Sequence, residues 1–405
     1  MNLTRFQRRG LLALVAAAVA AGTGAYAYSE YRTRARVAAL FAEGEAALSA
    51  REYSPAREKF EAYLGAHPDH ARARLLAARA ARQLRDYGAA REHLSVLRAA
   101  GQEVEAVQLE DALLDVRAGR FEAVPVLRER ARGDDELALV ALEVLVQHDI
   151  DTYQLASARS GFTRYLELRP TDLHALLGRA FVWERFMNFA DALEDYRRAV
   201  AAHPENARAR LKFAETALLA GTPAEAQAAF EWLAARDPNA PPVRLGLARC
   251  HRRLARPDDA KRLLSALRAE FPNHWEVLWE SGEVELESGS PEAAEQFLRR
   301  ATAARPFDRR PHYALYRCLL RLDRAADAER ASARVKQLDA DVSRINFLRD
   351  AVIQKPNDAN LRAEGGVLFL RNGEREEGVR WLELALRLDP TCEPALRALR
   401  GLGAP

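Results

Sequence analysis

Proline recurs along this chain at intervals of 34 residues or a multiple of 34. Six prolines keep one phase, and two more keep the same interval after a shift of 16 residues: Pro68, Pro170, Pro204, Pro238, Pro272 and Pro306, then Pro356 and Pro390. A fixed period of this length indicates a tandem array of one small unit, in which each unit buries its apolar face against its neighbours.

Other positions follow the same period. A small residue stands twelve positions before most of these prolines: Ala56, Ala158, Ala192, Ala226, Ala260, Ala294 and Gly378, with Ala90 and Ala328 in repeats that lack the proline. A large apolar residue follows four positions later: Phe60, Leu94, Phe162, Tyr196, Phe230, Leu264, Leu298 and Leu382. The small residue lets two helices approach closely, the large one fills the space between them, and proline ends the second helix because it lacks an N–H.

This pattern resembles the tetratricopeptide repeat family, in which a small residue, an alanine, a large residue and a proline recur at fixed positions. The resemblance covers roughly residues 37–392. It implies an all-α fold, a right-handed superhelical solenoid of about ten helix pairs. It also implies binding of other proteins. A transmembrane or signal segment is expected to precede the repeats, for reasons given below.

The period divides the chain into repeats. Nine repeats occupy residues 37–342, a tenth occupies 359–392, and residues 393–402 are expected to form a capping helix. The third and fourth repeats depart from the pattern, with Val124 and Arg128 in the small and large positions of the third and Val146 in a small position of the fourth. Local stability should therefore be lowest there, because these helix pairs fit less well.

Residues 343–358 interrupt the period between the ninth and tenth repeats. Ala340 stands where the ninth repeat should carry its proline, so the second helix can continue, and we expect one helix from Arg324 to Gln354. Its apolar residues are spaced as one helical stripe: Ala331, Val335, Leu338, Val342 and Ile345. This stripe either packs in the core against the tenth repeat or forms a partner surface.

The N-terminus contains a basic tail, residues 1–9, and an uncharged segment, residues 10–29. Twenty helical residues are long enough to span a bilayer, which predicts a single-pass anchor in the cell membrane with the repeats on the extracytoplasmic, periplasmic side. A signal peptide comprising residues 1–27, cleaved from a secreted protein, is the alternative. Three arginines flank the segment on each side, so the inverted topology with cytoplasmic repeats also stays open.

Composition gives no support to several classes of function. The chain has 61 Lys and Arg against 58 Asp and Glu, and most arginines have an acidic residue three or four positions away, so no one-sided basic face for nucleic acid is expected. Three cysteines without a CxxC pair predict neither a disulfide framework nor a zinc site. No phosphate-binding or nucleophile motif occurs, and His148, Asp149 and Asp151 lack the spaced fourth ligand of a metal site. We therefore predict neither catalytic activity nor a cofactor.

The resemblance places partner-binding side chains on the first helices of the repeats, where the family's concave groove lies. Carried over residue by residue, the predicted groove residues of repeats six to nine are Arg208, Leu211, Glu215, Leu245, Arg249, Arg252, Arg253, Glu276, Trp279, Glu283, Tyr313, Arg317 and Arg321. No Lys-x-x-x-Asn pair is present, so the carboxylate clamp of some family members is absent. The alternative is that these arginines pair with glutamates of neighbouring repeats as ordinary surface groups.

The sequence thus favours one function over its rivals. We expect a membrane-anchored, exported scaffold that binds proteins or peptides in its groove. The alternatives are a regulatory adaptor that faces the cytoplasm and a non-catalytic subunit of an envelope enzyme complex. The sequence does not determine the partner or the oligomeric state.

Overall fold

The computed structural model describes residues 31–32, 34–102 and 105–402. Within these ranges the regular structure is helical and no residue lies in a β-strand, in agreement with the predicted all-α fold. The expected anchor or signal segment, residues 10–29, lies outside the described residues. Among the described residues, no helix combines the length and the apolar character that a membrane span requires.

The chain forms two compact units, Met1–His148 and Asp149–Pro405. The period assigns nine consecutive repeats to residues 37–342. The boundary falls within the fourth repeat, one of the two repeats that depart from the pattern.

In the first unit, residues 34–49 are helical and pack with Phe41 and Leu48 against α2. The following elements are α2 (Tyr53–Ala66), α3 (Ala71–Gln83), α4 (Tyr87–Ala99), α5 (Glu105–Arg117), the 3₁₀ turn η1 (Phe121–Ala123), α6 (Val124–Arg130) and α7 (Glu136–Asp151), whose last turn belongs to the second unit. In the third repeat the second helix is replaced by η1 and the seven-residue α6. The repeat in which Val124 and Arg128 replace the small and the large packing residue thus has a shortened second helix.

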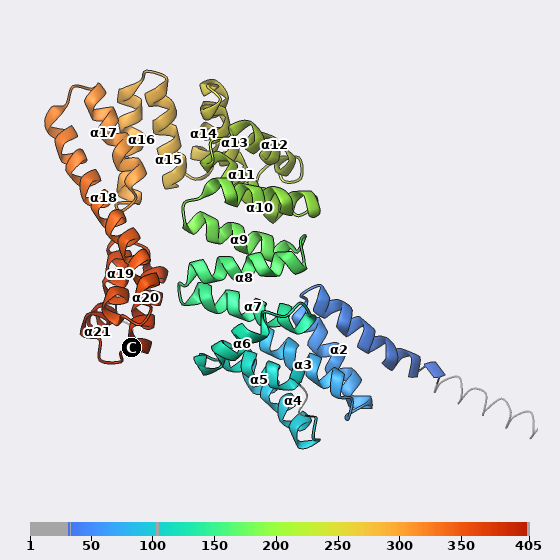
Figure 1. Ribbon diagram of the computed structural model, residues 1–405. Coiled ribbons are helices and arrows are strands. Elements are labelled where there is room, and N and C mark those ends of the chain that lie inside the picture. The colour runs from blue at the N-terminus through green and yellow to red at the C-terminus, as the bar shows by residue number, and fades with distance from the viewer. Residues whose placement is uncertain (1–30, 33, 103–104, 403–405) are drawn as a thin grey trace, which may run out of the picture. The chain divides into compact units, whose positions relative to one another are not determined.

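The second unit contains regular helix pairs (Figure 1). They are α8 (Leu155–Leu168), α9 (Leu173–Arg185), α10 (Phe189–Ala202), α11 (Ala207–Leu219), α12 (Pro223–Ala234), α13 (Pro241–Arg253), α14 (Pro257–Glu270), α15 (Trp275–Glu287), α16 (Pro291–Ala304), α17 (Arg309–Arg321), α18 (Ala325–Gln354), α19 (Ala359–Arg371), α20 (Arg375–Leu388) and α21 (Glu393–Arg400). In repeats six to eight the second helix begins at a proline. Proline is tolerated there because the first N–H groups of a helix have no intrahelical partner, so the missing N–H costs little.

The turn inside each repeat has a left-handed residue at a fixed place. Positive φ angles recur every 34 residues and then shift with the insertion, at Arg51, Arg85, Gly119, Tyr153, Met187, Gly221, Ala255, Gly289, Asp323 and Gly373. Six of these residues are not glycine, so the packing of the two helices outweighs the modest cost of this conformation for a residue with a side chain.

The contacts between small and large residues follow the sequence pattern. A Cβ atom on Gly282 would lie 2.5 Å from side-chain atoms of Leu298, and one on Gly366 would lie 2.6 Å from Leu382. The first helix of each of these repeats therefore approaches the second too closely for a larger residue. In other repeats the corresponding large residues, Phe60, Phe230 and Leu264, are also buried.

Helix α18 is 30 residues long, whereas α16 has 14. Val335, Leu338 and Ile345 of the predicted stripe are buried, but Val342 is 47% exposed. The stripe is therefore mainly core. The extra turns of α18 carry the tenth repeat away from the ninth, and Val342 stays uncovered where the two repeats separate.

The tenth repeat contacts the beginning of the same unit. The Arg362 guanidinium donates to the carbonyl oxygen of Thr152 at 3.2 Å, and Arg185 NH2 lies 3.4 Å from Glu377 Oε1. The rings of Tyr153 and Trp381 meet edge to face with centroids 4.9 Å apart. These contacts join residues about two hundred positions apart, so the helix pairs of the second unit close on themselves.

A candidate partner-binding groove

The site is organised by a buried carboxylate. Glu280 of α15 is 2% exposed, and it accepts hydrogen bonds from Nε of Arg249 and from Nε of Arg252, both on α13, at 2.9 Å each. Arg252 also donates to Glu287 Oε1 at 2.8 Å. We call Arg249, Arg252 and Glu280 the Arg–Glu fork. It joins the first helices of the seventh and eighth repeats and fixes the positions of both guanidinium groups.

The same fork occurs in the first unit. Arg79 and Arg82 of α3 both donate to Glu110 of α5, and these three residues have the same spacing along the chain as Arg249, Arg252 and Glu280. These three residues stand five periods before Arg249, Arg252 and Glu280. A fork that recurs at equivalent positions joins neighbouring repeats whatever the partner, so its arginines have a structural role in addition to any role in binding.

The carboxylates around Arg252 favour its protonated, charged form. Burial lowers the pKa of Arg252, but the carboxylates of Glu280 and Glu287 raise it more, so its pKa lies above the usual range. Arg249 NH2 lies 3.2 Å from Glu276 Oε1 without hydrogen-bond geometry, so this contact is an ion pair only. Arg252 therefore keeps its charge, and its guanidinium and the carboxylates of Glu280 and Glu287 form a mixed-charge wall.

Aromatic side chains lie beside the fork. The rings of Trp275 and Trp279 on α15 stack with centroids 6.3 Å apart. The Arg310 guanidinium lies 4.8 Å from the Trp275 centroid and 5.1 Å from that of Trp279, and Arg249 lies 5.9 Å from Trp279. Within the described structure, the indole N–H of Trp279 has no hydrogen-bond acceptor.

A pocket of ≈ 320 Å³ opens between α11, α13 and α15. Its apolar lining comes from Leu218, Leu219, Phe230, Pro242, Leu245 and Gly246. Its polar lining comes from Glu215, Arg249, Arg252, Arg253, Glu276, Glu280 and Arg310, with Trp279 between the two groups. The pocket therefore combines an apolar floor with a charged wall, and concave sites with convergent polar groups are where ligands usually bind.

The structure brings together seven of the predicted groove residues in this pocket: Glu215, Leu245, Arg249, Arg252, Arg253, Glu276 and Trp279. Leu245 is only 5% exposed and belongs mainly to the core. Arg253 is exposed, and in the described part of the chain no ion pair involves it. It is therefore the arginine of this set that a partner can engage without disturbing the fold.

The other predicted groove residues lie outside the pocket: Arg208, Leu211, Glu283, Tyr313, Arg317 and Arg321. Glu283 is buried and lies 3.3 Å from Arg317 NH1. Arg321 donates to the carbonyl oxygen of Leu286, Leu211 packs partly buried against the sixth-repeat core, and Arg208 and Tyr313 are exposed. The alternative stated from the sequence was that these arginines pair with glutamates of a neighbouring repeat. Arg249, Arg252 and Arg317 do form such pairs.

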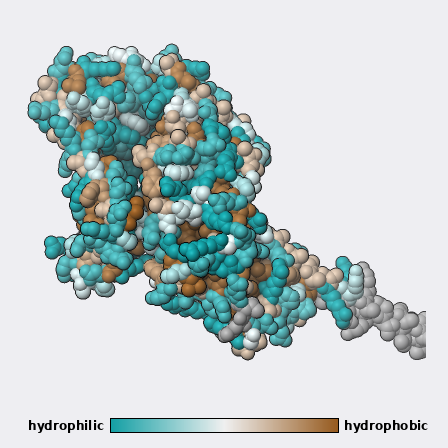
Figure 2. All heavy atoms as spheres, in the orientation of Figure 1, coloured by the Kyte–Doolittle hydropathy of each residue, from teal (hydrophilic) through white to brown (hydrophobic). Residues whose placement is uncertain are grey.

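The predicted set omitted Glu280, which organises the fork. A signal existed in the sequence, because Arg-x-x-Arg followed by a glutamate at the same distance occurs in both the second and the seventh repeats. On the face shown in Figure 2, hydrophilic residues predominate and hydrophobic residues form separate patches. Among the described residues, no group of three or more His, Cys, Asp or Glu side chains is arranged to hold a metal ion.

The solved structures that match the chain share little sequence with it. A tetratricopeptide repeat protein from Parabacteroides merdae is 14% identical, with 70% of this chain and 98% of that chain covered and a TM-score of 0.35. PilW, a type IV pilus biogenesis factor, is 17% identical, with 50% and 94% covered and a TM-score of 0.42. A human IFIT1 dimer with m7Gppp-AAAA is 16% identical, with 79% and 90% covered and a TM-score of 0.39.

Comparison with family models is more specific. No curated protein matches the chain. Two models described as tetratricopeptide repeat match it, one at residues 41–105 and 184–241 and the other at residues 217–281. The matched segments include α3, α4 and α11 to α14, and so contain much of the pocket. The segments matched are tetratricopeptide repeats, and repeats of this kind are generally protein-interaction scaffolds.

Proposed function

We propose that this protein is a non-catalytic scaffold that binds an extended segment of a partner protein in the groove formed by α11, α13, α15 and α17. The observation that carries the proposal is the pocket in which Trp279, Arg253 and an apolar floor converge. Tryptophan and arginine are the residue types that most often dominate the energy of protein interfaces.

The surroundings of the pocket support a peptide as the ligand. Leu219 is 59% exposed, Tyr313 is 40% exposed and Leu320 is 49% exposed on the first helices of repeats six and nine. These side chains provide apolar contacts at intervals along the groove. Cations and carboxylates alternate between neighbouring helices, which suits a polypeptide of mixed charge better than a nucleic acid. The groove is already formed by packed helices, so binding requires little ordering of the protein.

The test is a double variant of the pocket, Trp279→Ala with Arg253→Glu. We expect it to weaken capture of the partner by at least about 2 kcal/mol, because it removes an aromatic anchor and reverses an exposed charge. Arg249 is left unchanged, because Glu280 and Glu276 hold it and its reversal would disturb the fold. The measurement is affinity capture of the full chain from membranes, followed by quantitative mass spectrometry.

The matched control is Trp232→Ala with Arg256→Glu. Trp232 is half-buried on α12, a second helix, and its ring lies under Arg210 and Arg236 rather than in the pocket. This control should retain the captured partner. If the same protein is captured equally by both variants, with unchanged circular dichroism, the groove is not the binding site.

We further propose that the scaffold is anchored in the membrane with its repeats exported. The support is the uncharged segment of residues 10–29 behind a basic tail, which is long enough to span a bilayer. The full-length chain should remain in the membrane pellet after carbonate extraction, and an alkaline-phosphatase fusion after residue 405 should be active. A protein whose N-terminal sequence begins near Tyr28 would show cleavage and secretion instead, and an inactive phosphatase fusion would show cytoplasmic repeats.

A further inference from the structure

The fork of the first unit lacks a carboxylate that the fork of the second unit has. In the second unit, NH1 of Arg252 donates to Glu287 Oε1 at 2.8 Å. Arg82 holds the place of Arg252 five periods earlier, but Arg117 stands where Glu287 does. Arg117 is the last residue of α5, as Glu287 is the last residue of α15. A cation thus replaces the carboxylate at this position of the first unit.

The replacement leaves buried donors without acceptors. Arg82 is 1% exposed, and its Nε donates to Glu110 at 2.9 Å. NH1 and NH2 of Arg82 are also buried, and among the described residues they have no hydrogen-bond acceptor. The same is true of Nε of Arg117. Buried polar groups are nearly always hydrogen-bonded, so these donors indicate an acceptor that this part of the chain does not supply.

Positive charge is in excess around this fork. Glu110 also accepts from Nε of Arg79 at 2.7 Å, so one carboxylate serves two guanidinium groups. In the described part of the chain, no ion pair involves Arg117. The three further carboxylates beside the fork of the second unit, Glu276, Glu283 and Glu287, have the counterparts Ala106, Leu113 and Arg117. Buried charges are normally paired, so the excess favours an anion.

The polar groups of the adjacent repeats do not remove this excess. Arg51 pairs with Glu143 at 2.6 Å, and both side chains are partly exposed. Burial and the Glu143 carboxylate raise the pKa of Tyr53, whereas Arg51 and Arg82 act in the opposite direction. These groups therefore lie near one hydroxyl, which places the ion pair in the neighbourhood of Arg82. Arg51 already neutralises Glu143, so this carboxylate adds no net negative charge.

The third repeat provides a route to the buried guanidinium. Its first helix, α5, carries Glu110 and Arg117, and its second helix is replaced by η1 and the seven-residue α6. Helices with less packing open locally at a low cost in free energy. A small solute can reach Arg82 during such an opening. The 1% exposure of Arg82 leaves no surface on which a folded partner could dock.

We propose that the first unit binds a small oxyanion on Arg82 and Arg117, in the place that Glu287 occupies in the second unit. The planar guanidinium group offers parallel N–H donors that match a carboxylate or a phosphate. The bound anion links α3 to α5 and stabilises the second and third repeats. This site is independent of the proposed peptide groove, which lies in the second unit.

The test is hydrogen exchange of the full chain, read by mass spectrometry at neutral pH and constant ionic strength. Sodium chloride is compared with inorganic phosphate and with acetate. Phosphate, acetate or both should slow exchange in α3 and α5 about three- to tenfold, as expected when an anion at several times its Kd binds the folded form. The anion that acts identifies a phosphate or a carboxylate site. Exchange in α13 and α15 should not change, because Glu287 already pairs with Arg252.

Two variants should lose the response to the anion. Arg117→Glu supplies the carboxylate that the second unit has, so the slowing should disappear. Arg82→Met with Glu110→Leu removes the guanidinium together with its counterion, and it serves if the first variant does not fold. The matched control is Arg132→Glu, which makes the same change of charge as Arg117→Glu at a side chain that is 77% exposed between α6 and α7. This control should respond to the anion as the natural chain does.

Two results would overturn the proposal. Equal exchange of α3 and α5 in all three salts would mean that water, and no anion, satisfies Arg82. Slowing of the same size in α13 and α15, or in the folded Arg117→Glu variant, would show a general effect of the salt on the protein. Neither result bears on the peptide groove, because no measurement here involves Trp279 or Arg253.

Discussion

Replacing Glu110 with alanine is expected to lower the free energy of unfolding by about 3–5 kcal/mol, because a buried ion pair would lose one partner. Glu110 and Arg82 are each 1% exposed. The carboxylate accepts from Arg82 Nε at 2.9 Å and from Arg79 Nε at 2.7 Å, and NH1 and NH2 of Arg82 have no other partner in the described structure. The variant would leave a buried guanidinium without a counterion.

The effect should depend on pH. Burial raises the pKa of Glu110, but Arg82 and Arg79 lower it more, so its pKa lies below the usual value for glutamate. A carboxyl with a lowered pKa stabilises the fold above its unfolded-state pKa, and this contribution is lost as the pH falls through the folded-state pKa. The difference between the natural chain and Glu110→Ala should therefore be largest at neutral pH and decrease below about pH 4.

Urea unfolding followed by circular dichroism measures the loss, and hydrogen exchange in α3 and α5 locates it in the first unit. Glu45→Ala is the control, since Glu45 pairs with Arg72 at 2.7 Å on the surface and its loss should cost less than about 1 kcal/mol. Glu110→Leu with Arg82→Met should regain most of the stability, because it removes both charges. Equal losses for Glu110→Ala and Glu45→Ala would contradict this account of the fork.

Replacing Trp381 with alanine is the second change with a large expected effect, about 3–5 kcal/mol of stability. Trp381 is fully buried and packs edge to face against Phe369, with centroids 5.3 Å apart. It also meets Tyr153, which carries the contact between the tenth repeat and the start of the second unit. The substitution would leave a cavity in the tenth repeat and weaken the contact that closes the unit.

A double-mutant cycle separates the two effects. Trp381→Ala and Tyr153→Ala should show a coupling energy of about 0.5–1.5 kcal/mol, as expected for an aromatic pair in contact. Hydrogen exchange should rise in α20 for both variants, whereas Trp232→Ala, at a half-buried position on α12, should leave α20 unchanged. Additive effects of the two substitutions would mean that the tenth repeat does not contact Tyr153 in solution.

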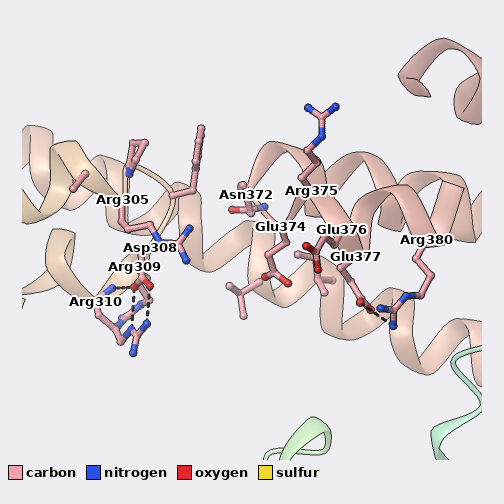
Figure 3. Close-up of a pocket in the computed structure, with 16 residues that line it drawn as sticks. Arg305, Asp308, Arg309, Arg310, Asn372, Glu374, Arg375, Glu376, Glu377 and Arg380 are labelled. Carbon is pink, nitrogen blue, oxygen red and sulfur yellow. Dashed lines mark hydrogen bonds and ion pairs between the residues drawn. The ribbon is translucent and has the colours of Figure 1, made fainter. Parts of the chain in front are cut away.

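The contact that closes the second unit lies beside a cavity next to α18. Arg185 donates to Tyr153 Oη at 2.7 Å and lies near Glu377, and Glu377 is one of the residues that line this cavity of ≈ 930 Å³ (Figure 3). The residues that hold the tenth repeat in place therefore also form part of the cavity wall.

The sequence by itself determined the helices and their pairing. A small residue, a large residue and a helix-ending proline act within one repeat, so their spacing is enough to place helix ends, such as those of α2 at Ala66 and α10 at Ala202, each two residues before a periodic proline. The long helix between Arg324 and Gln354 could be predicted for the same reason, because the missing proline removes a local stop signal. The family resemblance assigned Arg249, Arg253 and Trp279 to a groove on the first helices, and their role in binding stays a prediction.

Only the tertiary structure decided which side chains meet across repeats. Two such contacts join separate helices: the pairing of Arg249 and Arg252 with Glu280, and the contact of Tyr153 with Trp381. The exposure of Val342 likewise depends on which helices pack beside it. Each depends on the rotation between successive repeats, which adds up along the stack, and on the displacement that α18 introduces. A repeating pattern specifies the unit accurately, but small differences in how units stack decide where distant residues come together.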